Sequence, residues 1–324
     1  MSIAKKSMKI IKRILIAVAG LIVLSLFGGY FYFEKKFTPK INNLTVENSS
    51  GYIPIFWERS QDSDMSALLL PVKIKGVNIP LYMQLDCGSP NTIFYSRAME
   101  SLMLNFPASI QPADSLHHIS LSYTLGNLII SSNQFAMIEY GQAINADTPD
   151  SIHIIGTIGT DLMEKRITIL DFKNNNCAFT TAMPDGIEEA ELQQFTFKKR
   201  RIMLPGKIDQ EEMSFLFDTG TSAYSLITSQ NLFEKYSTKN GNEVLSTGNS
   251  WGNTLTVHTK ESNKVIDFGS TITPIANVTF IEGTSFLQNL LMRFSEMDGM
   301  IGNKLFKDKV VVLNCAHEKF AIIE

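Results

Sequence analysis

The 324-residue chain has few cysteines, which limits what can hold its fold together. Only Cys87, Cys177 and Cys315 are present, so at most one intramolecular disulfide can form. Small secreted domains that depend on disulfides carry many more cysteines for their length. Hydrophobic residues make up 44% of the sequence, so we expect a fold stabilised by a buried apolar core.

The sequence also lacks the motifs of several functional classes. Apart from the adjacent His117 and His118, its five histidines form no metal-ligand spacing with another histidine or a cysteine. No His-Glu-x-x-His, Gly-x-Ser-x-Gly or phosphate-loop pattern occurs. The formal net charge is −3, and no long basic run lies beyond Lys40. We therefore expect no metal ion, no organic cofactor and no nucleic-acid partner.

One long uncharged segment stands near the N-terminus, at residues 14–33. At 1.5 Å per helical residue it is long enough to cross a bilayer core of ~30 Å. Five basic residues precede it and three follow, which modestly favours a cytoplasmic N-terminus. A cleaved signal peptide is the alternative, but no Ala-x-Ala-like site follows the segment.

This pattern predicts the order of the N-terminal parts. Residues 1–13 are expected in the cytoplasm, residues 14–33 form an uncleaved transmembrane helix, and residues 34–65 form a polar linker. The rest of the chain is expected on the extracytoplasmic side, which is the periplasm in a two-membrane cell.

Two four-residue motifs of one kind dominate the rest of the sequence. Asp86, Cys87, Gly88 and Ser89 form the first, and residues 218–221 form the second, which reads Asp-Thr-Gly-Thr. Each follows a stretch in which apolar residues alternate, as in a strand with one buried face. Two carboxyls that face each other share a proton, so that one activates a water and the other protonates a carbonyl.

The flanks of the two motifs repeat as well. Downstream of the first motif, Thr157–Leu162 matches Met300–Leu305 in the second copy. The interval between motif and match is longer in the second copy, which therefore carries an 11-residue insertion before Phe268. Repeats of this length indicate two homologous lobes and not a solenoid. We place lobe one at residues 66–185 and lobe two at residues 186–324.

The hydrophobic pattern predicts a mainly β protein with short helices. Alternating apolar residues predict a strand from Ile119 to Leu125, turned by Gly126, and residues 96–104 form a candidate helix. In the register that aligns Thr157 with Met300, Gly126 corresponds to Gly269.

The Asp-Thr-Gly-Thr motif, followed far downstream by Ile-Gly before Asn-Lys-Leu-Phe and an apolar strand, resembles the aspartic protease family. Each unit is similar to the retropepsin-like form, and the doubled single chain is similar to the pepsin-like form. The resemblance covers roughly residues 66–324. It implies two closed β-barrel-like lobes of the acid protease type in a monomer. It also implies a membrane-anchored aspartic endopeptidase that cleaves peptide or protein substrates with a water activated by Asp86 and Asp218.

The resemblance also implies roles for the residues beside the aspartates. Ser89 and Thr221 are expected to hydrogen-bond the outer carboxylate oxygens. Cys87 and Thr219 occupy the position whose hydroxyl bonds across the lobe boundary in the family. The glycines, Gly88 and Gly220, fit a close backbone approach that a Cβ would prevent.

Two features depart from the family pattern. Cys87 stands where threonine or serine is expected, and a thiol is a weak hydrogen-bonding group. The stretch of lobe one that should form the lid, residues 105–118, contains no glycine. In lobe two, residues 239–256 contain Trp251 and three glycines. That segment is expected either to close over the cleft, with Trp251 near the substrate, or to be an ordinary long loop.

These departures leave a second function open. A non-catalytic, peptide-binding relative of the aspartic proteases would keep the cleft and lose the chemistry.

Overall fold

The computed structural model describes most of the chain beyond residue 37, and the predicted transmembrane segment at residues 14–33 lies outside the described part. Among the described residues, no helix is long and apolar enough to cross a membrane. Contacts divide the chain into residues 1–41 and residues 42–324, and all strands belong to the second unit. The described residues are 35, 38–60, 63–110, 117–146, 148, 151–184, 186–188, 192–250, 253–282 and 297–324.

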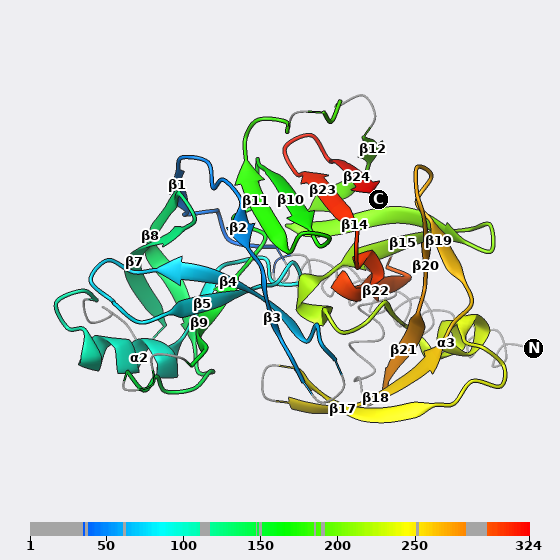
Figure 1. Ribbon diagram of the computed structural model, residues 1–324, viewed down its shortest axis with the longest axis horizontal. Helices are drawn as coiled ribbons and strands as arrows, with labels where there is room; N and C mark the ends of the chain where they lie inside the picture. The colour runs from blue at the N-terminus through cyan, green and yellow to red at the C-terminus, as the bar shows by residue number, and fades with distance from the viewer. Residues whose placement is uncertain are drawn as a thin grey trace, which may run out of the picture. The chain divides into compact units, whose positions relative to one another are not determined.

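The prediction of a mainly β fold is confirmed, and Figure 1 shows the strands with the two short helices α2 and α3. Six strands of lobe one pair in a closed circuit, in the order β4–β5–β9–β6–β8–β7 and back to β4. The six strands are β4 (Ala67–Lys73), β5 (Leu81–Leu85), β6 (Ile93–Tyr95), β7 (His118–Leu125), β8 (Leu128–Ile138) and β9 (His153–Ile158). The helix α2 (Ser96–Asn105) confirms the helix that the sequence predicted.

The strands of this barrel alternate between a buried and a more exposed face because successive side chains point to opposite sides. Leu81, Met83 and Leu85 of β5 are almost completely buried, whereas Tyr82 and Gln84 are half-buried. The same alternation carries Tyr123 of β7 into the core. A continuous apolar core therefore fixes the direction in which β5 presents its last side chains.

Lobe two repeats part of the pairing of lobe one, but its described strands form an open path, so the expected closed barrel is present in lobe one and not in lobe two. β15 runs parallel to β22 as β5 does to β9, and β16 lies between β21 and β22 as β6 lies between β8 and β9. Its elements are β14 (Arg201–Ile208), β15 (Glu211–Phe217), β16 (Leu226–Thr228), α3 (Gln230–Tyr236), β18 (Asn253–Glu261), β19 (Val265–Asp267), β20 (Ile272–Pro274), β21 (Asn277–Glu282) and β22 (Gly299–Ile301).

Equivalent hairpin turns confirm that Gly126 corresponds to Gly269. Gly126 turns β7 into β8 with a φ of 56°, and Gly269 turns β19 into β20 with a φ of 89°. Both glycines have the left-handed backbone conformation, which other residues adopt at a cost. The repeat read from the sequence is therefore also a repeat of backbone geometry.

The 11-residue insertion corresponds to an extra hairpin in lobe two. β17 (Val244–Ser250) pairs antiparallel with β18 along its whole length, and β18 pairs on its other side with β21. Among the described residues of lobe one no hairpin corresponds to it, because the first strand after α2 is β7, which pairs with β8. This places the extra hairpin between α3 and β19, before Phe268 as expected.

A six-stranded sheet joins the two lobes. At its centre β10 of lobe one pairs antiparallel with β23 of lobe two, and Figure 1 shows these strands side by side with β11 and β24. Ile169 faces Val312 across this pair. The strands of this sheet are β12 (Gln193–Gln194), β24 (Lys319–Ile323), β23 (Val310–Asn314), β10 (Ile167–Asp171), β11 (Asn176–Thr180) and β2 (Ile53–Pro54).

The middle of the predicted linker forms short strands and is not a free connection. Residues 42–58 contain β1 (Thr45–Glu47), β2 and β3 (Phe56–Glu58), which pair with β8, β11 and β4 respectively. Ile53 and Ile55 are buried among these strands, which gives the segment its anchorage. The remaining short strand, β13 (Thr196–Lys198), pairs with β14.

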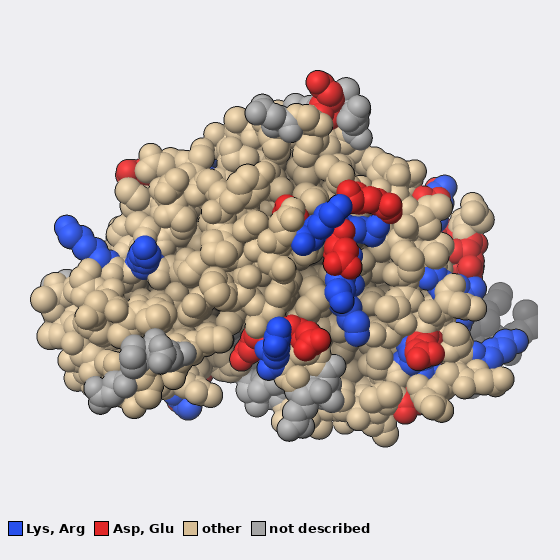
Figure 2. Space-filling model, in the orientation of Figure 1, with Lys and Arg blue, Asp and Glu red and all other residues tan. Residues whose placement is uncertain are grey.

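Figure 2 shows acidic and basic side chains interspersed on the face in view, with no broad area of one sign. That face therefore offers no extended basic surface to a phosphate backbone.

Candidate active site

The two motif aspartates stand at equivalent strand ends. Asp86 follows β5 and Asp218 follows β15. The amide of Asp86 donates to the carbonyl of Ile158 at 3.0 Å, and the amide of Asp218 donates to that of Ile301 at 3.0 Å. Each aspartate is thus held against the end of β9 or β22, the strand whose last residue is the isoleucine of the Ile-Gly segment in its own lobe.

The structure brings the two carboxyl groups together. Each carboxyl is close enough to the other to influence its pKa, and backbone amides bind one oxygen of each. Oδ1 of Asp86 accepts from the amides of Gly88 at 2.8 Å and Ser89 at 3.2 Å. Oδ1 of Asp218 accepts from the amides of Gly220 at 2.8 Å and Gly88 at 3.1 Å. Backbone groups from both lobes therefore fix the pair.

The glycines of the motifs are required by this close approach. A Cβ on Gly88 would lie 2.7–2.8 Å from the carboxyl atoms of Asp218. A Cβ on Gly220 would lie 2.6 Å from Oδ1 of Asp86. Each glycine therefore leaves the space that the aspartate of the opposite lobe occupies, so the group that approaches closely is a side-chain carboxyl and not the expected backbone.

Burial makes it costly for both carboxyls to be ionised. It raises the pKa of Asp86, against the opposing effect of the hydrogen bonds that this carboxyl accepts. It also raises the pKa of Asp218 well above the usual range, and the nearby charge of Asp86 adds to the increase. Asp218 is only 8% exposed. Desolvation and like-charge repulsion together favour a state with one shared proton.

Thr219 connects the lobes beneath the carboxyls. Its Oγ1 donates to the carbonyl of Leu85 at 2.8 Å and accepts from the amide of Cys87 at 2.9 Å. Sγ of Cys87 lies 3.8 Å from Sδ of Met163 and also interacts with the side chain of Thr219, but among the described residues it makes no matching pair of bonds to the backbone of lobe two. The interlobe hydrogen bonding is therefore one-sided, with the hydroxyl supplied by lobe two.

The hydroxyls of Ser89 and Thr221 were expected to hydrogen-bond the outer carboxylate oxygens, and this expectation is wrong for both. Oγ of Ser89 donates to the carbonyl of Asn91 at 2.8 Å, and Oγ1 of Thr221 donates to the backbone carbonyl of Asp218 at 2.9 Å. A hydroxyl has one proton to donate. Because backbone carbonyls accept that proton, the carboxylates are held by amides instead.

The Ile-Gly segments brace the two aspartate loops. A Cβ on Gly159 would overlap the backbone of Asn91, and a Cβ on Gly302 would overlap the carbonyl of Thr221. The residues that follow these glycines add hydrogen bonds to the same loops. Oγ1 of Thr160 lies 3.1 Å from the carbonyl oxygen of Ser89, to which the Thr160 amide donates at 2.9 Å, and Nδ2 of Asn303 donates to Oγ of Ser222 at 2.6 Å.

Arg200 of lobe two reaches into the aspartate loop of lobe one, a role that the sequence did not reveal. It lies in the turn between β13 and β14 and is 6% exposed. Its Nη1 donates to Oδ1 of Asn91 at 2.7 Å and to the carbonyl of Pro90 at 3.3 Å. Its Nη2 pairs with Oε2 of Glu164 at 3.2 Å, and its carbonyl accepts from Oγ1 of Thr160 at 2.7 Å.

The extra hairpin of lobe two passes close to the Asp218 loop. A Cβ on Gly248 of β17 would lie 3.9 Å from Oη of Tyr224, which follows that loop. At the base of the hairpin, His258 bonds to Glu243 at 2.6 Å and to Glu282 at 3.3 Å. Trp251, the expected substrate contact, lies outside the described residues.

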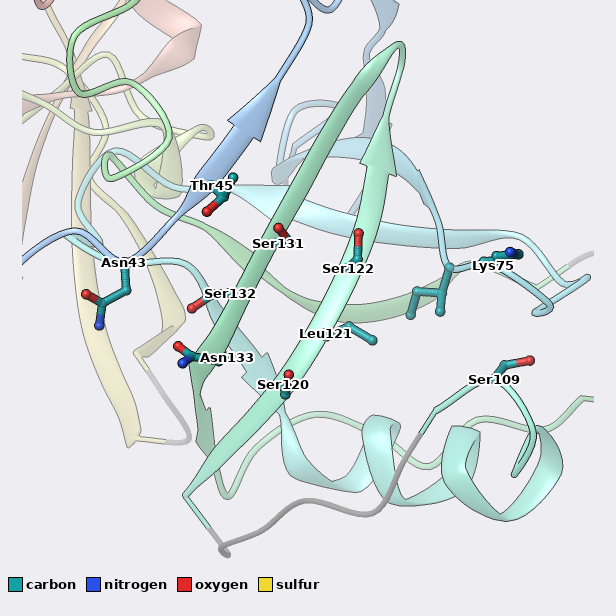
Figure 3. Close-up of a pocket in the computed structure, with 11 residues that line it drawn as sticks. Asn43, Thr45, Lys75, Ser109, Ser120, Leu121, Ser122, Ser131, Ser132 and Asn133 are labelled. Carbon is teal, nitrogen blue, oxygen red and sulfur yellow. The ribbon is translucent and has the colours of Figure 1, made fainter.

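Two cavities lie on lobe one, and neither contains an aspartate of the pair. The first, of about 640 Å³, is polar and lies over β7 and β8, where Ser120, Ser122 and Ser131 project from neighbouring strands (Figure 3). The second, of about 620 Å³, lies against β5 and includes Gln84 and Tyr95. In the described ranges, no three His, Cys, Asp or Glu side chains are grouped as metal ligands would be.

Comparison with known proteins gave no match to any protein-family model or to any curated protein, so the function has to be inferred from the site itself.

The Arg200 contacts predict a coupled loss of stability and activity. Arg200→Met removes charged hydrogen bonds worth about 1.5–3 kcal/mol each, so we expect the free energy of unfolding to fall by a similar amount. The loop that carries Asp86 loses its support, so kcat should fall more than KM rises. Arg200→Lys should restore part of both. Lys198→Met, an exposed neighbour, is the control, and equal effects of the two methionine variants would contradict the role of Arg200.

The one-sided hydrogen bonding predicts that Cys87 can be replaced by a hydroxyl residue. Cys87→Ser and Cys87→Thr restore the missing donor, which is worth about 1 kcal/mol when well placed. Melting temperature and peptide hydrolysis should be preserved or increased, with serine also testing whether the extra methyl of threonine fits. Loss of activity in a folded Cys87→Ser variant would show that the thiol itself has a specific function.

Proposed function

We propose that this protein is an aspartic endopeptidase in which Asp86 and Asp218 activate one water for attack on a peptide bond. The observation that carries this proposal is the pair of neighbouring carboxyls after β5 and β15, in which Asp218 is buried, Asp86 is half-buried and each raises or lowers the pKa of the other. Such a pair holds one proton at moderately acidic pH. One member is then a base and the other an acid, which is what hydrolysis by an activated water requires.

The chemistry follows from the shared proton. The ionised carboxyl takes a proton from water as its oxygen attacks the peptide carbonyl carbon. The protonated carboxyl gives its proton to the carbonyl oxygen, which forms a tetrahedral diol. Collapse of the diol breaks the C–N bond: one diol hydroxyl gives its proton to the ionised carboxyl, and the nitrogen takes a proton from the protonated carboxyl and leaves as an amine. The amides of Gly88 and Gly220 keep the carboxyls in place throughout.

The repeated pairing of the strands supports the two-lobed architecture of the acid protease type. Each lobe supplies one aspartate, and the central sheet, Thr219 and Arg200 connect the lobes. In this proposal an extended peptide lies between the lobes and bonds through its backbone. A single chain then contains the whole site and acts as a monomer.

The β17–β18 hairpin is the lid in this proposal. It lies in lobe two beside the Asp218 loop, and Trp251 falls in the sequence between its two strands. A lid excludes water from the cleft once the substrate is bound.

The apolar segment at residues 14–33 places the enzyme at a membrane. As proposed from the sequence, it anchors the chain, with the body on the extracytoplasmic side.

One observation favours a second candidate, a peptide-binding relative without activity. The thiol of Cys87 contacts Met163 and the Thr219 side chain, but it makes no pair of bonds to the backbone of the opposite lobe like the pair that Thr219 makes. A looser pair would bind peptide without hydrolysing it efficiently.

Replacing either aspartate tests the proposal directly. Asp86→Asn and Asp218→Asn each remove a member of the acid–base pair, so peptide hydrolysis should fall by about 10²–10⁴-fold. Asp209→Asn is the matched control because Asp209 lies on the surface, where it pairs with Lys264. Hydrolysis of a peptide library by the full chain is the readout, and circular dichroism checks the fold. Undiminished hydrolysis in either variant would reject the pair, and no hydrolysis by the native chain would favour the peptide-binding alternative.

The raised pKa values predict how activity and stability depend on pH. kcat/KM should fall as pH rises through the higher pKa of the pair, because the shared proton is then lost. The folded state also holds that proton more tightly than the unfolded state, whose aspartates titrate near pH 4. Its stabilising effect is thus complete at low pH and is lost as pH rises through the raised pKa.

Thermal unfolding of the native chain and of Asp218→Asn at pH 4 and pH 7 checks this sign. The native chain should lose more stability than the variant between the two pH values. The opposite order would contradict the proton-sharing pair.

A further inference from the structure

The cavity of about 620 Å³ lies against the outer face of β5, the strand that ends at Asp86. Its volume is within the range of sites that hold ligands. The lining comes from four neighbouring parts of lobe one and from β3, and it includes Gln84, Tyr95, Tyr140, Ile154, Glu58 and Glu139.

The cavity and the Asp86 side chain share one face of β5. Gln84 precedes Asp86 by two residues, and residues two apart on a strand point to the same side, about 7 Å from each other. Met83 and Leu85 face the buried core instead. The charge of Asp86 also contributes to raising the pKa of Tyr95 to about 12, although burial is the main cause. A substrate held at the aspartates therefore has a neighbouring side chain within reach of the cavity.

Two tyrosines form a fixed aromatic wall in the cavity. Tyr95 is 4% exposed, and its hydroxyl is 2.7 Å from Oγ1 of Thr157, which sets the orientation of the ring. Tyr140 packs edge-on against it, with ring centroids 4.9 Å apart. A Cβ on Gly141 would lie 2.8 Å from Cβ of Tyr95, so the backbone also packs tightly here. Aromatic and aliphatic walls suit the long apolar stem of a lysine or arginine, and aromatic rings also attract its charge.

The charged groups around the cavity have a negative balance. Glu58 and Glu139 are exposed side chains in its lining, whereas Arg97 is the single lysine or arginine there. Neither carboxylate forms an ion pair with another described residue. His153 is buried, with Nε2 3.2 Å from the carbonyl of Thr148. The cavity thus combines an apolar wall with carboxylates near solvent, where the charged end of a long basic side chain would lie.

We propose that this cavity is a substrate subsite that selects a lysine or arginine side chain close to the scissile bond. This inference rests on the proposed endopeptidase function and names its substrate class: peptides with a basic residue at one fixed position beside the bond that is cleaved.

Digestion of an unbiased peptide library by the full chain, read by mass spectrometry, tests the preference. Lysine and arginine should be enriched at one position near the cleaved bond.

A matched pair of peptides that differ only by lysine or norleucine at that position then measures selectivity as a ratio of kcat/KM values. In the double variant Glu58→Gln, Glu139→Gln this ratio should fall about tenfold or more, and in Glu58→Lys, Glu139→Lys a glutamate peptide should become preferred.

Glu212→Gln is the surface-glutamate control because Glu212 lies on the β14–β15 hairpin of lobe two, where it pairs with Lys207. This control should leave the ratio unchanged. Cleavage without basic enrichment, or an unchanged ratio in the double variant, would overturn the subsite while leaving the endopeptidase proposal intact.

A binding measurement separates failure of the subsite from failure of the proposed function. If the native chain cleaves no peptide, fluorescence anisotropy compares its affinity for the same lysine and norleucine peptides. Tighter binding of the lysine peptide that disappears in the double variant would support the subsite in a non-catalytic protein. Equal affinity would reject it.

Discussion

The site depends on two carboxyl groups held against each other in a place where water can hardly stabilise their charges. Burial raises the pKa of both aspartates, and the charge of one raises that of the other further. Left free, two such groups would separate and each would find solvent. The surrounding backbone prevents this, because amides of Gly88, Ser89 and Gly220 hold the oxygens while the glycines leave the space that the approach requires. The repeated fold can be understood as the frame that delivers one aspartate from each side.

The connection between the lobes is asymmetric although the fold is repeated. Lobe two supplies the bridging hydroxyl of Thr219 and the guanidinium of Arg200, and both end on the aspartate loop of lobe one. Lobe one offers Cys87 in return, whose thiol faces Met163. Lobe two also carries the extra hairpin. A single chain can distribute these parts unequally, whereas a symmetric dimer would have to carry each of them twice.

The sequence predicted those features that depend on local pattern. Alternating apolar residues placed both aspartates at strand ends, and the register of the repeat located the equivalent turns at Gly126 and Gly269. The change in spacing between the two copies predicted an insertion between the Asp218 motif and Phe268, where the structure has the β17–β18 hairpin. Each of these features is specified by neighbouring residues, so each can be read without the tertiary structure.

Features that depend on distant contacts could not be read in the same way. Arg200 lies in a run of four basic residues, and nothing in that run distinguishes the one that is buried. The hydroxyls of Ser89 and Thr221 find nearer acceptors in backbone carbonyls, a choice that depends on the exact turn of each loop. Residues 42–58 are polar enough to look like a linker, and they form strands only because β4, β8 and β11 offer edges for pairing.

The central claim is that the two aspartates share one proton, and carbon-13 NMR of the aspartate carboxyl carbons tests it most directly. A pH titration of the native chain, compared with Asp86→Asn and Asp218→Asn, identifies the two resonances. The account predicts that they titrate as a coupled pair, in which one proton is retained at pH values well above the usual aspartate pKa. In either variant this high-pH titration step should be absent. Two independent titrations near pH 4 would contradict it.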